Sequence, residues 1–225
     1  VITAAGGDNI VLGDNGVVNL NNAGSNDIFT TDEALGDHDV ITTGTGENIV
    51  LGGVAGDTIT VGDGTAIILG DNGAVRRTGL TVTLVETGDE AGTTGAADMI
   101  TSTGGTNVIL GGVGADTIEA PGGTNIILGD NGEVHLNNAG GANDVFTTEP
   151  MIGSGDLITG GSGDNIILGG AAGDLITGGA GRDIVLGDNG RVGRILQGGA
   201  YRITRIETTA TTTGNRLRPA NALPP

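Results

Sequence analysis

The sequence predicts an all-β fold in which short strands stack as a solenoid, and three observations support this prediction. Glycine contributes 47 of the 225 residues, about three times the share found in an ordinary protein. Ile, Val and Leu fall in short clusters such as Ile166-Ile167-Leu168, which a disordered chain would lack. Aromatic residues make up 1% of the chain, too few for a conventional core. Because glycine forms tight turns and β-branched residues favour strands, this composition indicates many short strands joined by turns.

Repeats of two lengths divide the chain into blocks. The segment Leu-Gly-Asp-Asn-Gly occurs four times, with its aspartate at Asp14, Asp71, Asp130 and Asp188. A finer period of nine residues precedes these segments and is clearest in residues 160–186, which read GGSGDNIIL, GGAAGDLIT and GGAGRDIVL. The acidic repeat region covers residues 1–190, with blocks at about 4–16, 37–73, 96–132 and 154–190. A thin core of this kind is completed only when repeats stack, which predicts a β-solenoid.

The nonapeptides resemble the RTX, or haemolysin-type calcium-binding, repeat of bacterial secreted proteins. Residues 178–186 match the pattern G-G-x-G-x-D-x-U-x at every fixed position, where U is a large aliphatic residue. The resemblance covers residues 37–69, 96–128 and 154–186, with a partial match at about 4–12. It implies a parallel β-roll, in which the first six residues of each repeat form a calcium-binding turn. The last three residues would form a strand, with the U side chain pointing inward.

In such a roll, successive nonapeptides lie on opposite edges, so that residues 18 apart in the sequence stack on one edge. The sixth turn position then divides the molecule into an Asp edge and an Asn edge. The Asp edge contains Asp39, Asp57, Asp98, Asp116, Asp156 and Asp174, and the Asn edge contains Asn48, Ala66, Asn107, Asn125, Asn165 and Asp183. Calcium prefers six to eight oxygen ligands, including carboxylates and main-chain carbonyls. We therefore predict calcium mainly along the Asp edge, whereas stacked asparagines can satisfy one another through amide hydrogen bonds. The alternative is that the aspartates only stabilise turns through the backbone.

The four aspartates of the Leu-Gly-Asp-Asn-Gly segments open the next turn on the Asp edge. Two interpretations remain open for them, because they could complete the last calcium site of a block or belong to simple Asn-Gly turns. The full set of candidate calcium ligands is Asp14, Asp39, Asp57, Asp71, Asp98, Asp116, Asp130, Asp156, Asp174, Asp183 and Asp188.

The strands that follow the Asn-edge turns are apolar on both faces. Their outward pairs include Ile49/Leu51, Ile126/Leu128 and Ile166/Leu168, a pattern typical of strands buried on both sides. We expect the inserts at about 17–36, 74–95 and 133–153, with a hairpin-like segment at 191–212, to cover this sheet. The alternative is that a second copy of the chain packs there and forms a dimer or fibre. Residues 213–225 lose the repeat and are expected to be an irregular or disordered tail.

Composition also limits the function. The formal net charge of −18 makes nucleic acid a poor partner, and no apolar stretch is long enough to span a membrane. The chain contains no cysteine, and its histidines and serines form no recognisable catalytic motif, so we do not expect an enzyme. Because the sequence begins at Val1 without a signal peptide, we expect a mature piece or a fragment.

The sequence therefore predicts a calcium-binding structural module of an extracellular or cell-surface bacterial repeat protein, such as an adhesin, surface layer or fibre. Calcium is expected to drive its folding and to favour contacts with other copies. One alternative is the calcium-dependent secretion and folding region of an RTX toxin or enzyme. A weaker alternative is an ice- or glycan-binding face built on outward threonines such as Thr60, Thr159 and Thr177.

Overall fold

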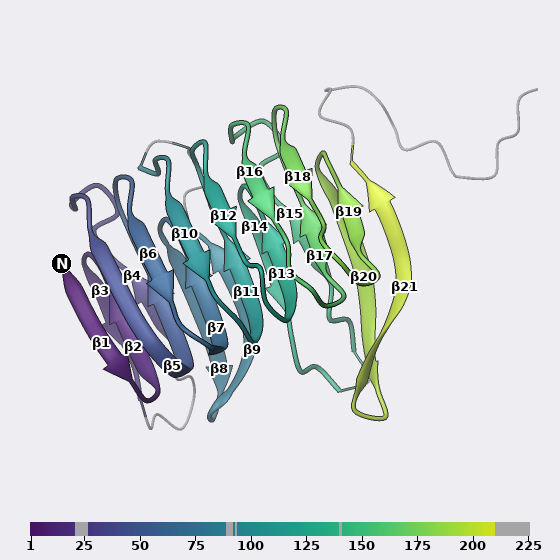
Figure 1. Ribbon diagram of the computed structural model, residues 1–225, viewed down its shortest axis with the longest axis horizontal. Coiled ribbons are helices and arrows are strands. Elements are labelled where there is room, and N and C mark those ends of the chain that lie inside the picture. Colours follow the sequence, from purple (N-terminus) through teal and green to yellow (C-terminus); the bar gives the residue numbers. More distant parts are fainter. Residues whose placement is uncertain (21–26, 89–91, 93, 140, 210–225) are drawn as a thin grey trace, which may run out of the picture.

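A computed structural model of the chain describes residues 1–20, 27–88, 92, 94–139 and 141–209. The predicted tail at 213–225 lies outside the described residues, as do the last residues of the hairpin-like segment at 191–212. The described part is all-β and contains no helix, and its coils follow one another along the long axis of the molecule (Figure 1). It therefore offers no helix that could cross a membrane. The predicted parallel β-roll is confirmed.

Two parallel sheets form the solenoid, and each coil contributes one strand to each sheet. Sheet A follows the Asp-edge turns and contains β1 (Ile2–Gly6), the first part of β5 (Val40–Leu51), β6 (Thr58–Val61), β10 (Met99–Ser102), β12 (Thr117–Glu119), β16 (Leu157–Thr159) and β18 (Leu175–Thr177). Sheet B follows the Asn-edge turns and contains β2 (Asn9–Leu12), the second part of β5, β7 (Gly64–Leu69), β11 (Thr106–Leu110), β13 (Thr124–Leu128), β17 (Ile166–Leu168) and β19 (Ile184–Leu186). The pairing of Ile158 with Ile176 and of Ile167 with Val185 shows the expected register of 18 residues.

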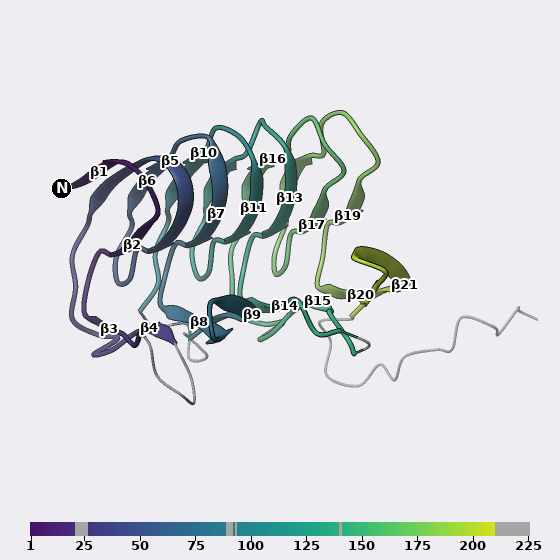
Figure 2. The same ribbon diagram turned by 90° about the horizontal axis from the view of Figure 1, so that it is seen from below.

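The inserts form a third, antiparallel sheet of eight strands, sheet C. Its strands are β3 (Gly16–Val18), β4 (Ile28–Thr30), β8 (Gly73–Thr78), β9 (Thr81–Thr87), β14 (Gly132–His135), β15 (Val145–Thr147), β20 (Gly190–Gln197) and β21 (Ala200–Thr208). Each insert folds as a hairpin, and neighbouring hairpins pair edge to edge, as β9 does with β14. Figure 2 shows the three sheets as layers, with sheet B in the middle.

Sheet B separates two hydrophobic cores. One core lies between sheets A and B and contains the inward row of Ile41, Ile59, Ile100, Ile118 and Ile158, all fully buried. The other lies between sheets B and C, where leucines such as Leu110 and Leu128 meet Val85, Val134 and Val145 of the hairpins. Sheet B is therefore buried on both faces, as its continuous aliphatic pattern predicts, and the inserts supply its cover.

Candidate functional site

The aspartates of the Asp edge form one unbroken ladder along the solenoid. The main-chain amide of each one donates a hydrogen bond to Oδ1 of the aspartate in the next coil. The successive distances are 2.7 Å from Asp39 to Asp57, 2.6 Å to Asp98, 2.8 Å to Asp116, 2.8 Å to Asp156 and 2.9 Å to Asp174. One carboxylate oxygen of each aspartate after Asp39 is thus fixed by the backbone, and the side chains stack in register.

The second carboxylate oxygen of these aspartates has no such partner. Oδ2 of Asp57, Asp98, Asp116, Asp156 and Asp174 is buried and makes no hydrogen bond. A Cβ placed on Gly111 would collide with both Oδ2 of Asp116 and the carbonyl oxygen of Gly129, so these two oxygens face the same small space. Gly70 has the same relation to Asp98 and Gly111 O. At both positions two oxygen acceptors therefore converge on the Cα of a glycine, and no N–H or O–H group donates to the carboxylate oxygen.

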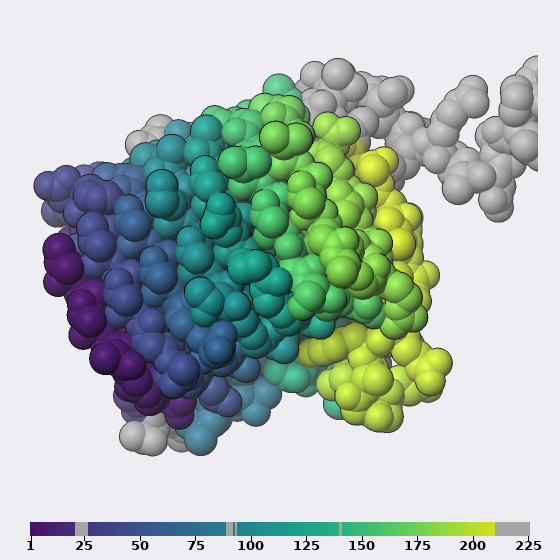
Figure 3. All heavy atoms as spheres, in the orientation of Figure 1, coloured from purple at the N-terminus to yellow at the C-terminus, as the bar shows by residue number. Residues whose placement is uncertain are grey.

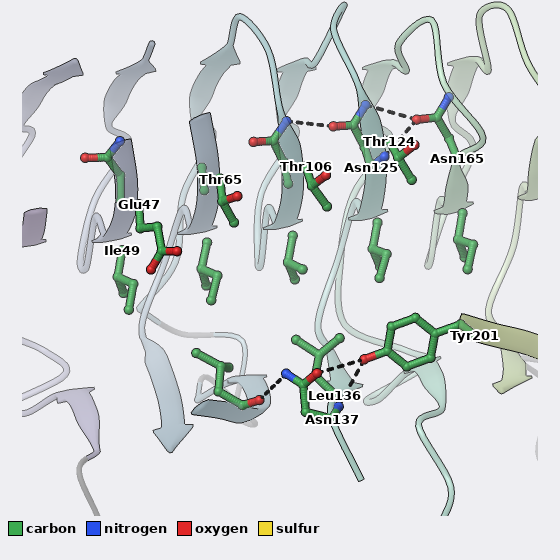
Figure 4. Close-up of a pocket in the computed structure, with 18 of the residues that line it drawn as sticks. Glu47, Ile49, Thr65, Thr106, Thr124, Asn125, Leu136, Asn137, Asn165 and Tyr201 are labelled. Carbon is green, nitrogen blue, oxygen red and sulfur yellow. Dashed lines mark hydrogen bonds between the residues drawn. The ribbon is translucent and has the colours of Figure 1, made fainter. Parts of the chain in front are cut away.

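The Asn edge shows how the same position is satisfied when a donor is present. Nδ2 of Asn125 donates to the carbonyls of Ala120 and Gly122, both at 3.1 Å, and to Oδ1 of Asn165 at 3.0 Å. Asn107 donates in the same way to Oδ1 of Asn125 at 2.7 Å. The predicted amide ladder is present, and Figure 4 shows part of it above a row of aliphatic side chains. An aspartate lacks this NH₂ group, which leaves Oδ2 facing the turn without a donor.

Burial makes ionisation of the Asp ladder unfavourable. It raises the pKa of Asp98 to about 10, with the charges of Asp71 and Asp116 as further causes. Burial also raises the pKa of Asp57 and of Asp116 to about 7 and that of Asp156 to about 8, although the backbone hydrogen bonds act in the opposite direction. A bound proton or a bound cation would offset this cost at these four aspartates.

Asp14, Asp71 and Asp130 have a different environment on the same edge. Both oxygens of each carboxylate accept main-chain amides from two separate turns. For Asp130 the donors are Ser154 at 3.1 Å and Ala171 at 2.5 Å. Asp14 binds the amides of Asp37 and Val54, and Asp71 binds those of Ala96 and Val113. These three aspartates thus hold adjacent turns together, a role that differs from both the calcium site and the simple Asn-Gly turn considered from the sequence.

The last two candidates lie at the C-terminal end of the roll. Asp188 is exposed, although it occupies the same repeat position as Asp130. Asp183 belongs to the amide ladder, because its Oδ1 accepts a 2.9 Å hydrogen bond from Nδ2 of Asn165. The structure therefore brings together the six ladder aspartates and separates Asp183 from them on the opposite edge.

The donor chemistry of the Asp edge fits calcium. Unpaired carboxylate oxygens and glycine carbonyls are hard oxygen ligands of the kind this ion prefers. Among the described residues, no three His, Asp or Glu side chains gather at one point as a metal cluster. A calcium ion on this edge would thus take carboxylate oxygen from the ladder and the remaining ligands from main-chain carbonyls. Its charge would replace the donor that the asparagines supply on the other edge.

The outward face of sheet A, which faces the viewer in Figure 3, contains the threonine row considered for ice or glycan binding. The strand register aligns Thr42, Thr60, Thr101, Glu119, Thr159 and Thr177 in one row. Thr42 and Thr101 thus extend the row beyond the three threonines named in the sequence analysis. The neighbouring row is mixed, with Met99, Leu157 and Leu175 all exposed.

Comparison with known proteins finds no match for this chain. No protein-family model matches the chain, and neither a curated protein nor a solved structure matches it.

Proposed function

We propose that this chain is a calcium-binding structural module of an extracellular bacterial repeat protein of the RTX type, such as an adhesin, surface layer or fibre. The observation that carries the proposal is the row of buried, unpaired Oδ2 atoms along the Asp edge. A buried polar atom without a partner is costly, and a repeated one calls for a ligand. On this proposal the chain acts as a scaffold and performs no catalysis.

Calcium would act by stabilising the ionised ladder. In the absence of a cation, ionisation of Asp57, Asp98, Asp116 and Asp156 at neutral pH opposes folding, because burial raises each pKa. An ion that binds the folded ladder but not the unfolded chain shifts the equilibrium toward the folded state. The millimolar calcium outside a cell would then complete folding there.

The three-layer construction supports a scaffold role. The inserts are themselves repeated, and their hairpins complete the core over sheet B. Every described hairpin therefore contributes to one continuous rod-like core, which suits an extended structural protein. A region needed only for secretion would not require this additional layer.

Circular dichroism and sedimentation, first in EGTA and then in calcium, test the proposal, with magnesium as the matched control. We expect β structure to increase and the sedimentation profile to become that of a compact particle when calcium is added, and to change much less with magnesium. Identical folding in EGTA, calcium and magnesium would contradict the proposal.

A further inference from the structure

A long groove lies between sheets B and C, on the side of the Asn edge. Its volume is about 960 Å³, which is within the size range of small-molecule sites. Figure 4 shows its two walls, with the strands of sheet B above and the hairpin residues Leu136, Asn137 and Tyr201 below. Sheet C thus covers sheet B closely near the Asp edge but leaves this channel open beneath the Asn edge.

Sheet B forms the floor of the groove, which is a straight row of aliphatic side chains. The strand register aligns Ile49, Ile67, Val108, Ile126, Ile166 and Ile184, one from each successive strand of sheet B. Adjacent strands are about 4.8 Å apart, so the row extends along the solenoid axis for about 24 Å. Such a floor fits a linear apolar ligand that lies across the strands.

The backbone and the side chains around the groove limit which class of ligand it can bind. The backbone of the central floor strands is paired on both sides within sheet B, so it offers no edge to an added peptide strand. Thr65, Thr106 and Thr124 line one rim in register, and Leu80 and Val82 of the β8–β9 hairpin line the other. Contacts along the groove are therefore mainly apolar and non-directional, which suits a hydrocarbon chain.

Three arginines, Arg77, Arg182 and Arg194, line the groove, and Arg194 is the most deeply buried of them. The β20–β21 pairing is irregular between Gly193 and Arg194, a feature that re-aims a side chain, and Arg194 lines the groove while only 3% exposed. Its guanidinium donates to the carbonyls of Asn143 at 2.8 Å and His135 at 3.2 Å, and it lies over the ring of Tyr201. Among the described residues it has no carboxylate partner within ion-pair distance, because the nearby Asp144 pairs with Arg191. Asp144 also accepts the main-chain amide of Arg194 at 3.1 Å, so it is the nearest source of negative charge, but it makes no ion pair with the guanidinium. A buried guanidinium that makes no direct ion pair favours an anionic ligand.

The charge at the other end of the groove gives the ligand a direction. Asp8 and Glu47 line the N-terminal end, whereas Asp164 and Asp183 of the C-terminal coils are accompanied by Arg182, which pairs with Asp164, and by Arg194. An anion is therefore repelled more strongly at the N-terminal end. We propose that the groove binds a linear acyl chain with an anionic head group, such as a long-chain carboxylate. The head group lies at Arg194, and the chain lies along the aliphatic floor toward Glu47. This inference does not depend on calcium binding at the opposite edge.

Isothermal titration with dodecanoate and with methyl dodecanoate tests the proposal, below the concentrations at which micelles or calcium soaps form. We expect dodecanoate to bind about tenfold or more tightly than the ester, because a charged hydrogen bond is lost in the ester. No binding of dodecanoate, or equal binding of the two compounds, would overturn the proposal.

Substitutions at the groove rim and at Arg194 test where the ligand binds. Thr106→Trp and Thr124→Trp fill the groove from exposed positions and are expected to abolish binding, whereas Thr42→Trp on the outer face of sheet A is expected to leave it unchanged. Arg194→Gln is expected to remove the preference for the carboxylate, with the exposed Arg202→Gln as its control. Thermal unfolding confirms that each variant is folded. If Arg194→Gln does not fold, the rim variants and the ester comparison still decide the proposal, and unchanged binding in both rim variants contradicts it.

Discussion

The main-chain amide of Asp98 donates a 2.8 Å hydrogen bond to Oδ1 of Asp116, while Oδ2 of Asp116 is buried and unpaired. The same relationship recurs from coil to coil along the Asp edge. Stacking therefore holds Oδ1 of each carboxylate in a hydrogen bond and leaves Oδ2 available to a proton or a cation.

The first prediction concerns pH in the absence of calcium. The pKa of Asp57, Asp98, Asp116 and Asp156 is higher in the folded chain than the ordinary value of 3.8, reaching about 7 to about 10. A group with a raised folded-state pKa contributes stability that is complete below its unfolded pKa and is lost as the pH rises through the folded pKa. In EGTA, the melting temperature should therefore fall steadily from about pH 4 to about pH 10.

Calcium should reverse this trend, because it binds the ionised carboxylates. Melting curves by circular dichroism in EGTA and in calcium, over the same pH range, make the comparison. A melting temperature that rises with pH in EGTA would show that the buried carboxyls do not control stability.

The second prediction concerns the replacement of one aspartate of the Asp ladder by asparagine. Asp116→Asn supplies the missing NH₂ donor and should stabilise the calcium-free protein at neutral pH by about 1–3 kcal/mol, the cost of one unsatisfied buried polar group. In calcium the same change should weaken binding. Urea unfolding in EGTA measures the effect, and Asp63→Asn at an exposed position is the control. A loss of stability in EGTA would contradict the expectation.

The third prediction is the reverse change on the Asn edge. Asn125→Asp replaces a donor that binds Ala120 O and Gly122 O with an acceptor, in a fully buried position. We expect destabilisation of at least about 1–3 kcal/mol, larger at high pH than at low pH because burial opposes the charge. Urea unfolding at two pH values measures it, and the exposed Asn138→Asp serves as the control. Equal stability at both pH values would argue against the proposed role of the amide ladder.

The fourth prediction uses two glycines at the same repeat position. A Cβ on Gly129 would collide with Oδ2 of Asp156 and the carbonyl of Gly169, whereas a Cβ on Gly187 meets nothing within 4 Å. Gly129→Ala should therefore destabilise the protein by at least about 1–3 kcal/mol through overpacking, and Gly187→Ala should be nearly neutral. Thermal unfolding of both variants provides the comparison. Similar effects in the two variants would mean that the turns on the Asp edge are not tightly stacked.

Much of the fold is visible in the sequence because the repeat is strict. The 18-residue spacing assigns Asp98 and Asp116 to one edge, and the aliphatic pairs such as Ile126/Leu128 predict a sheet buried on both faces. The pairing between separate inserts could not be predicted in this way. Val134 pairs with Val85 from a hairpin about 50 residues earlier, and short alternating segments do not specify such partners.

The details of the candidate site were also beyond sequence reasoning. The spacing predicts the row of aspartates but not that Oδ1 accepts a main-chain amide while Oδ2 remains unpaired. The different role of Asp130 depends on the amides of Ser154 and Ala171, which reach it from two separate turns. The groove near Arg194 arises from how far the hairpins stand from sheet B, which no local pattern encodes.

Direct measurement of bound calcium tests the central claim most closely. Equilibrium dialysis of the intact chain is compared with the triple variant Asp98→Asn, Asp116→Asn and Asp156→Asn, which keeps the shape of the ladder and removes the charge of three of its six aspartates. We predict that the intact chain binds several calcium ions and that the triple variant remains folded but loses most of them. Equal calcium binding by the two proteins, or no binding by the intact chain, would contradict the assignment of the Asp edge as the calcium site.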